Sequence, residues 1–369
     1  MPKLKELCFL ITDGEHGSVK DDKTGSCFLL SNKNLNNGFI TIDDNDRRIG
    51  IETKNKLNKR TKIGKNTILI STVGTIGKLA FINDDNINYS FQRSVGIIKP
   101  NVNLINPYFL YSLLQTREYQ ERFGQMASGS VQKCIFISGL EELDIKDYAI
   151  DKQNKIGKTF FDIDGLIKNN VDIINSLTNK IKDVYSYYMP KQSGEKRKLS
   201  DFVSIVNETY SHKKDLPLID LSIIPSNSLI INEVSSSSKL NTNLKTLKKG
   251  DYLFGSIRPY LKKSIVSPID GLTTGTVIQM RPHVQNMNNF LLGVLTSESF
   301  FEFAVNNSTG TKMPVVKAKD LINYEFTYNK KFVEWFDSQN NYLELILSLL
   351  NENIKLNEYK QLLLSTLFK

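Results

Sequence analysis

The feature that most constrains this chain is an internal duplication. Three pairs of segments match in hydrophobic pattern and in the placing of turn residues, the first pair at an offset of 184 positions and the others at 181: Lys65–Lys78 with Lys249–Lys262, Phe109–Leu114 with Phe290–Leu295, and Ala127–Lys133 with Ser308–Pro314. Solenoid repeats have periods of about 20 to 50 residues, so a repeat this long indicates two whole domains.

The 369 residues have room for two such domains and their connectors. Each repeat places strands before helices, an order typical of α+β domains rather than of a doubly wound sheet. We predict two tandem, pseudo-symmetric α/β domains, each followed by a long helix. The four parts are a first domain over residues 1–150, a spacer helix over 151–190, a second domain over 191–330 and a second spacer helix over 331–369.

Each repeat has the same expected layout. Runs of β-branched and apolar residues predict strands at Thr67–Val73 and Ser94–Pro100, and at Tyr252–Ile257 and Gly275–Pro282. A helix is expected to follow, beginning near Pro107 in one copy and near Asn289 in the other. The polar stretches at about 13–65 and 207–248, rich in Asn, Ser, Gly and Lys, are expected to be loop-like and to carry what differs between the domains.

The periodicity changes after each domain. From Ile156 to Tyr188, apolar residues recur at alternating steps of three and four, which is typical of a coiled-coil seam. Asn170 is the polar exception, and a polar seam residue fixes helix register at some cost in stability. A second apolar stripe begins near Phe332 and continues to the last residues with looser spacing. We expect the two helices to pack against each other in antiparallel orientation.

The formal net charge of +9 is concentrated in two clusters. Between Arg47 and Lys65, eight basic residues stand against one acid, and between Lys239 and Lys263, seven stand against one. A polyanion that is contacted at two places would favour this distribution. The alternative is that these lysines are merely solvated surface residues, and the presence of a cluster in both repeats makes that interpretation weaker.

No motif indicates catalysis or a metal site. Cys8, Cys27 and Cys134 lack metal-ligand spacing and are expected to be small buried residues, and the three histidines lie far apart. Gly74–Lys78 does not fit a phosphate loop, because Thr72 stands where the first glycine is needed. The short apolar start is no secretory signal, and no apolar run approaches the roughly 18 residues of a membrane span. We therefore expect a non-catalytic cytoplasmic protein with no membrane partner.

Short motifs in both halves, with their order and duplication, carry a family resemblance. They are Asp13–Gly17, Phe28–Asn34, Ile68–Lys78, Asn106–Leu110 and Gly129–Lys133 in the first half, and Gly255–Tyr260 and Asn306–Pro314 in the second. In these motifs the chain resembles the specificity subunit of type I DNA restriction-modification systems.

The resemblance implies two target recognition domains held apart by a pair of antiparallel helices, each reading one half of a split site in double-stranded DNA. It implies that two modification subunits dock on the helices and methylate adenine N6, and that two motor-nuclease restriction subunits join them. S-adenosylmethionine, ATP and Mg are then expected in the partner subunits, and no cofactor or metal in this chain.

Charge and loop position select the candidate contact residues. We expect the following to contact DNA, with Gln132 and Asn307 as weaker candidates for reading bases: Arg47, Arg48, Lys59, Arg60, Gln132, Lys133, Arg258, Lys262, Asn307 and Lys312. The apolar seams give the candidate docking residues for partner subunits, which are Ile163, Ile167, Ile174, Leu177, Ile181, Leu343, Leu347, Leu350 and Ile354.

Two other functions fit parts of the sequence. A coiled-coil scaffold with protein- or glycan-binding end domains would share the helices, but its binding would be insensitive to salt, whereas DNA binding weakens steeply as salt is added. A solitary enzyme subunit with hidden catalytic residues would show weak nuclease or methyltransferase activity on its own.

Overall fold

A computed structural model describes residues 1–43, 45–128, 133–211, 214–239, 243–339 and 341–369. The chain divides into two compact units. Unit 1 comprises Met1–Gly165 together with Lys360–Lys369, and unit 2 comprises Leu166–Tyr359. The boundary between the units therefore falls inside two helices, α5 (Ile150–Tyr188) and α10 (Tyr342–Leu367), each of which contributes to both units.

Unit 1 is built on an antiparallel four-stranded sheet with the strand order β1-β9-β6-β7. The strands are β1 (Cys8–Asp13), β6 (Thr67–Ser71), β7 (Leu79–Ile82) and β9 (Val95–Pro100). Every residue of β6 is buried, as expected of an apolar, β-branched strand in the middle of a sheet. Three helices pack on the side of this sheet, and they are α2 (Pro107–Leu114), α3 (Arg117–Met126) and α4 (Ile137–Glu141). A fourth, α1 (Ile51–Thr61), instead packs against two strands of a separate sheet, β2 (Cys27–Leu30) and β8 (Tyr89–Phe91).

Unit 2 repeats this arrangement. Its main sheet is antiparallel with the order β11-β18-β15-β16, formed by β11 (Val203–Ile205), β15 (Tyr252–Gly255), β16 (Ser264–Val266) and β18 (Val277–Pro282). Its helices are α6 (Asn288–Leu295), α7 (Glu298–Asn306), α8 (Ala318–Leu321) and α9 (Lys330–Ser338), and a ribbon of β10 (Glu195–Lys198) and β19 (Glu325–Tyr328) follows the domain's edge. The strands predicted in both repeats are thus confirmed, as is the α+β class.

The polar stretches that were expected to be loops instead contribute most of the strands of a second sheet in each unit. In unit 1 its order is β5-β2-β8, with strands β2 (Cys27–Leu30), β5 (Arg48–Ile49) and β8 (Tyr89–Phe91), beside a small pair β3 (Leu35–Asn36) and β4 (Phe39–Ile40). In unit 2 the order is β13-β12-β17-β14, with strands β12 (Pro217–Ile219), β13 (Ser235–Ser236), β14 (Leu244–Leu247) and β17 (Gly271–Thr274). Strands of two to four residues are too short to show a period of two, which is why the sequence reading missed them.

The single helix expected after each main sheet is two helices in the structure. In unit 1 the break lies at Thr116, whose hydroxyl donates to the carbonyl of Leu113 at 2.7 Å. In unit 2 it lies at Ser297, whose hydroxyl donates to the carbonyl of Val294 at 2.7 Å and accepts from the N–H of Phe300 at 3.3 Å. In both units the hydroxyl bonds back to the helix that ends there, and in unit 2 the Ser297 hydroxyl also caps the next helix.

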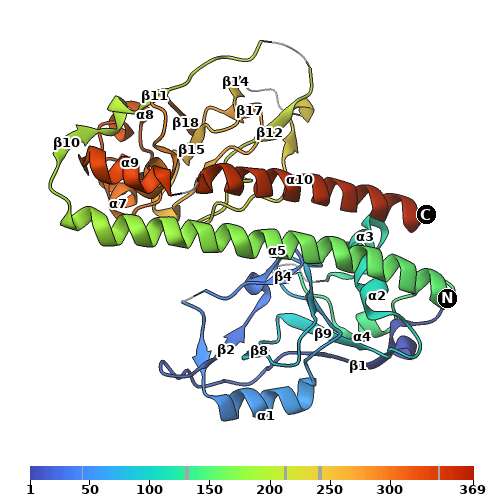
Figure 1. The fold of residues 1–369 in the computed structure, drawn as a ribbon. Coiled ribbons are helices and arrows are strands. Elements are labelled where there is room, and N and C mark those ends of the chain that lie inside the picture. The colour runs from blue at the N-terminus through green and yellow to red at the C-terminus, as the bar shows by residue number, and fades with distance from the viewer. Residues whose placement is uncertain (44, 129–132, 212–213, 240–242, 340) are drawn as a thin grey trace. The chain divides into compact units, whose positions relative to one another are not determined.

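The long helices have the predicted orientation within each unit (Figure 1). In unit 2, Asn170 of α5 donates to Asn353 of α10 at 2.9 Å, and the ammonium of Lys180 lies 5.1 Å from the Tyr342 ring, so the residue numbers run in opposite directions. The second spacer helix was expected to be continuous from Phe332 onward. It is divided into α9 and α10 instead, because Asn341 caps a new helix by accepting from the N–H of Glu344.

Candidate nucleic-acid interface

In unit 2, two loops that are distant in the sequence are joined at one end of the main sheet. We call them together the unit 2 tip, defined as residues 256–263 and 307–315. The first loop leaves β15 and turns through Arg258 and Lys262, both of which have a φ of 51°. Such left-handed conformations are uncommon for residues with a side chain and mark a tightly specified turn. They flank Pro259, which starts a short 3₁₀ helix.

Backbone hydrogen bonds attach the second loop to the first. The N–H of Arg258 donates to the carbonyl of Pro314 at 2.8 Å, and the N–H of Val316 donates to the carbonyl of Ser256 at 3.0 Å. Thr309 and Val315 exchange two further bonds of 2.9 Å, which close the second loop on itself. The tip is therefore held together by hydrogen bonds of its main chain.

Unit 1 has the same construction, the unit 1 tip, at residues 72–78, 127–128 and 133–135. The N–H of Gly74 donates to the carbonyl of Lys133 at 3.2 Å, and that of Ile135 donates to the carbonyl of Thr72 at 2.9 Å. Ser128 and Cys134 exchange bonds of 3.0 and 2.9 Å. The bonded positions are related to those of unit 2 by the offsets of 184 and 181 found in the sequence, so the duplication extends to individual hydrogen bonds. Gln132 lies outside the described residues.

The unit 2 tip brings together three of the predicted cations. Arg258 and Lys312 are exposed, whereas the Lys262 ammonium forms an ion pair with Glu298 at the start of α7. The Asn307 amide donates to the carbonyl of Phe303 at 2.9 Å, so this side chain partly serves to cap its own helix. Arg258 and Lys312 are consequently the cations most available to a ligand at this tip.

Two exposed side chains at the unit 2 tip were not among the predicted contacts. Tyr260 is 51% exposed and Met313 is 53% exposed, although both are large and largely apolar. An aromatic ring between two cations in a proline turn was the available signal, since aromatic and cationic side chains together are typical of nucleic-acid surfaces.

The predicted cations of unit 1 have varied surroundings. Arg47 donates to Asp21 at 2.7 Å, and the Arg48 guanidinium lies 4.9 Å from the centre of the Phe28 ring. Arg60 donates at 2.7 Å to the carbonyl of Gly14, so it supports the end of β1. Lys59, on α1, and Lys133, at the unit 1 tip, are exposed. The structure thus brings only Lys133 to the tip, and it places the other four on or beside the second sheet and α1.

The charge clusters are less equivalent than the sequence suggested. Four of the eight basic residues of the first cluster lie on α1, and the described residues of unit 2 contain no α-helix between β13 and β14. In the second cluster, burial lowers the pKa of Lys245 and of Lys263, and the Lys263 ammonium donates to the carbonyl of Leu221 at 2.8 Å. Part of the second cluster therefore supports the fold, and fewer of its charges face solvent.

The seam residues predicted to dock partners lie inside the chain's own cores. Leu177 is half-buried, and the other eight are buried: Ile163, Ile167, Ile174, Ile181, Leu343, Leu347, Leu350 and Ile354. A partner cannot contact these eight side chains while the fold is intact, so any docking on the helices would use their other faces. The apolar residues exposed on those faces include Phe161, Leu166 and Ile173 on α5 and Leu345 and Leu362 on α10.

The described residues hold no group of three or more metal-ligating side chains. His16 contacts the Asp13 carboxylate at 2.6 Å in an exposed loop, and His283 lies 3.0 Å from the Ser204 hydroxyl. His212 is outside the described residues. Across the described ranges, every helix is too short or too polar to cross a membrane.

Residues 14–182 match the family described as Type I restriction modification DNA specificity domain. Over these residues the chain is similar to the DNA specificity domain of type I restriction-modification systems. The match covers the whole of unit 1 apart from its two ends and continues along α5 into unit 2.

Two similar proteins agree with this likeness. The EcoBI type I restriction enzyme specificity subunit of Escherichia coli is 27% identical over 168 residues, which are 44% of this chain but only 35% of that subunit. The type I restriction-modification S subunit from M. genitalium has a TM-score of 0.51 at 17% identity, and the alignment covers 99% of this chain and 92% of that one. This second likeness shows that the whole chain has the specificity-subunit fold.

Proposed function

We propose that this chain binds double-stranded DNA and supplies the sequence specificity of a type I restriction-modification complex, with each unit reading one half of a bipartite target. The observation that carries the proposal is the duplicated tip. In both units the same backbone hydrogen bonds join the same two loops, and both tips expose cations. Two equivalent DNA-contacting tips suit a target site that has two parts.

The chemistry of the tips suits a duplex. Exposed cations such as Arg258, Lys312 and Lys133 would neutralise backbone phosphates and supply affinity. The Arg258 guanidinium could equally form a bidentate pair with guanine in the major groove. Because each tip is held by main-chain bonds, few contacts would need to be reorganised on binding, which limits the entropic cost.

The catalytic steps are proposed for partner subunits. Two modification subunits would dock on the exposed faces of α5 and α10 and methylate adenine N6 with S-adenosylmethionine. Two restriction subunits would add the motor and nuclease with ATP and Mg. In this division of labour the chain binds and positions DNA, and the residues of its tips perform no bond-breaking step.

The test is a salt titration of duplex binding with matched variants. Lys312→Gln removes an exposed charge at the unit 2 tip, and Lys330→Gln removes an exposed charge on α9 of the same unit. In fluorescence anisotropy, Lys312→Gln should weaken binding at every salt concentration and reduce the slope of log K against log salt by about 0.9. Lys330→Gln should leave the slope unchanged. Binding that ignores salt, or equal effects of both variants, would count against the proposal.

A further inference from the structure

A polar face of α5 lines a small cavity in unit 2. Asn175, Thr178, Asn179 and Lys182 are spaced by three and four residues, so they lie on one side of the helix, next to the buried seam of Ile174 and its neighbours. Asn175 and Asn179 are exposed, Lys182 is half-buried, and Thr178 is only 8% exposed. The side chains of this face therefore range from exposed to buried.

The opposite wall comes from the loop before β13, from the unit 2 tip and from the first residue of β16. Asn227, Ser228, Lys262 and Ser264 face the helix across a cavity of about 50 Å³. The N–H of Asn227 donates to the carbonyl of Lys262 at 3.0 Å, which fixes these two segments against each other. One water needs about 10 to 15 Å³ of such space, so the cavity has room for a small oxoanion.

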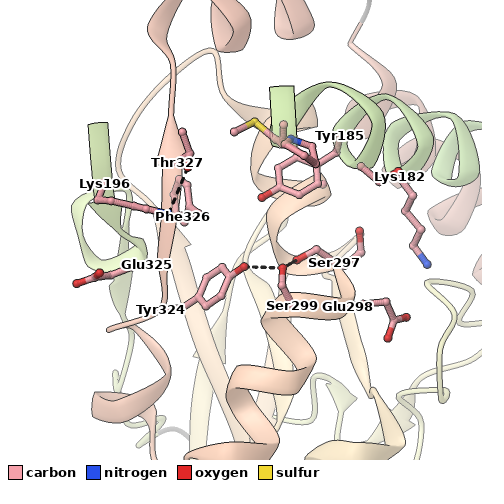
Figure 2. A pocket seen from close by; sticks show the side chains of 15 residues that line it. Lys182, Tyr185, Lys196, Ser297, Glu298, Ser299, Tyr324, Glu325, Phe326 and Thr327 are labelled. Atoms are coloured by element: carbon pink, nitrogen blue, oxygen red, sulfur yellow. Dashed lines mark hydrogen bonds between the residues drawn. The ribbon is translucent and has the colours of Figure 1, made fainter. Parts of the chain in front are cut away.

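Hydrogen-bonding groups at this cavity lack protein partners. The Thr178 hydroxyl is buried and bonds to no group in the described residues, although a buried hydroxyl without a partner is costly. The Lys182 ammonium donates no hydrogen bond within the described part of the chain, and the charges of Glu298 and Lys262 act on it. Figure 2 shows the Lys182 side chain leaving α5 on the side where Glu298 lies.

The local charge favours an anion. Two ammonium groups, those of Lys182 and Lys262, share one nearby carboxylate, that of Glu298, which is paired with Lys262. Burial lowers the pKa of Lys182, and the Lys262 ammonium lowers it further while Glu298 raises it. An anion in the cavity would relieve the repulsion between the two lysines and give the Thr178 hydroxyl an acceptor.

We propose that this cavity, between α5 and the unit 2 tip, binds a phosphate group through Lys182, Lys262 and the Thr178 hydroxyl. The phosphate would come from a DNA backbone or from free phosphate, since both present the same oxygens. The inference stands on the cavity itself and does not require the proposed function.

The larger neighbouring cavity, of about 670 Å³, does not compete for this role. Figure 2 shows that its hydroxyls already bond to one another, with Ser299 at 2.7 Å from Tyr324 and at 3.2 Å from Ser297. The hydroxyls of Ser297, Ser299 and Tyr324 are therefore already hydrogen-bonded within the protein.

The experiment titrates inorganic phosphate into the full chain in phosphate-free buffer at constant ionic strength, followed by calorimetry and thermal unfolding. Saturable binding is expected, and it should weaken about tenfold in Lys182→Gln, which loses a charge-assisted bond. Thr178→Val should also weaken binding without lowering the melting temperature of the phosphate-free protein, because the lost hydroxyl has no partner there. Lys180→Gln, an exposed charge on the same helix, is the control and should bind as the parent does. No saturable binding, or equal binding by all variants, would overturn the proposal.

A second arm uses duplex DNA to identify the source of the phosphate. If the site holds a DNA phosphate, Lys182→Gln weakens duplex binding and inorganic phosphate competes with the duplex. If it holds free phosphate, phosphate binds and duplex binding is insensitive to both. Duplex binding without phosphate binding would remove this site and leave the proposed function standing, and phosphate binding without duplex binding would do the reverse.

Discussion

Replacing Lys360 by methionine should destabilise unit 1 strongly, because it leaves a carboxylate buried without its cation. The Lys360 ammonium lies 2.7 Å from the Asp164 carboxylate, and the two side chains are 7% and 10% exposed. After the substitution, the Tyr108 hydroxyl at 2.7 Å would be the remaining side-chain donor to Asp164. Breaking a buried pair in this way costs about 3 to 5 kcal/mol. For a unit of this size that corresponds to a fall of about 10 °C in melting temperature.

Thermal unfolding followed by circular dichroism provides the assay, with two comparison variants. Lys355→Met makes the same change at an exposed position of α10 and should alter the melting temperature by less than about 2 °C. Adding Asp164→Asn to Lys360→Met should restore much of the lost stability, because a neutral amide still accepts from Tyr108 and carries no buried charge. If Lys360→Met were no worse than Lys355→Met, the assignment of this pair as a buried, stabilising contact between α5 and α10 would be refuted.

Two further predictions concern unit 2. Asn170→Leu should cost about 1 to 3 kcal/mol of unfolding free energy, because it leaves Asn353 buried without its partner. Leucine at both positions should be neutral or stabilising, because the Asn353 amide nitrogen already lacks an acceptor in the described residues. Urea unfolding would measure both variants, and additive effects of the two substitutions would contradict the coupling. Burial raises the pKa of Asp337 above its ordinary 3.8, so the folded state holds its proton to higher pH and this group's contribution to stability falls as pH rises through that window. The gain in melting temperature from Asp337→Asn should therefore grow between pH 4 and pH 8, and a constant difference would contradict it.

The duplication and the long helices could be predicted from the sequence because they depend on regular signals. The β-branched run at Thr67–Ser71 is a buried central strand, and the apolar seam that begins at Ile156 lies on helix α5. The polar exception Asn170 meets Asn353 on the facing helix, a pairing that needs the second helix's register and could not be derived from one stripe alone.

The second sheets and the side-chain environments could not be predicted, because they depend on contacts between distant residues. The parallel pair of β2 and β8 joins Phe28 to Tyr89 across 61 positions of sequence with no periodic signal in either strand. Charge alone could not distinguish Arg60, which supports the carbonyl of Gly14, from the exposed Lys312. The phosphate cavity was likewise invisible, since its lysines come from α5 and from the unit 2 tip.

The central claim is that the duplicated units together specify one bipartite DNA target. The most direct measurement is a genome-wide map of N6-methyladenine in cells with and without this gene. We predict a single motif of two short specified tracts, separated by a spacer of fixed length, that is methylated only when the gene is present. An unchanged map in cells whose modification subunits are active, or loss of an undivided motif, would contradict the account.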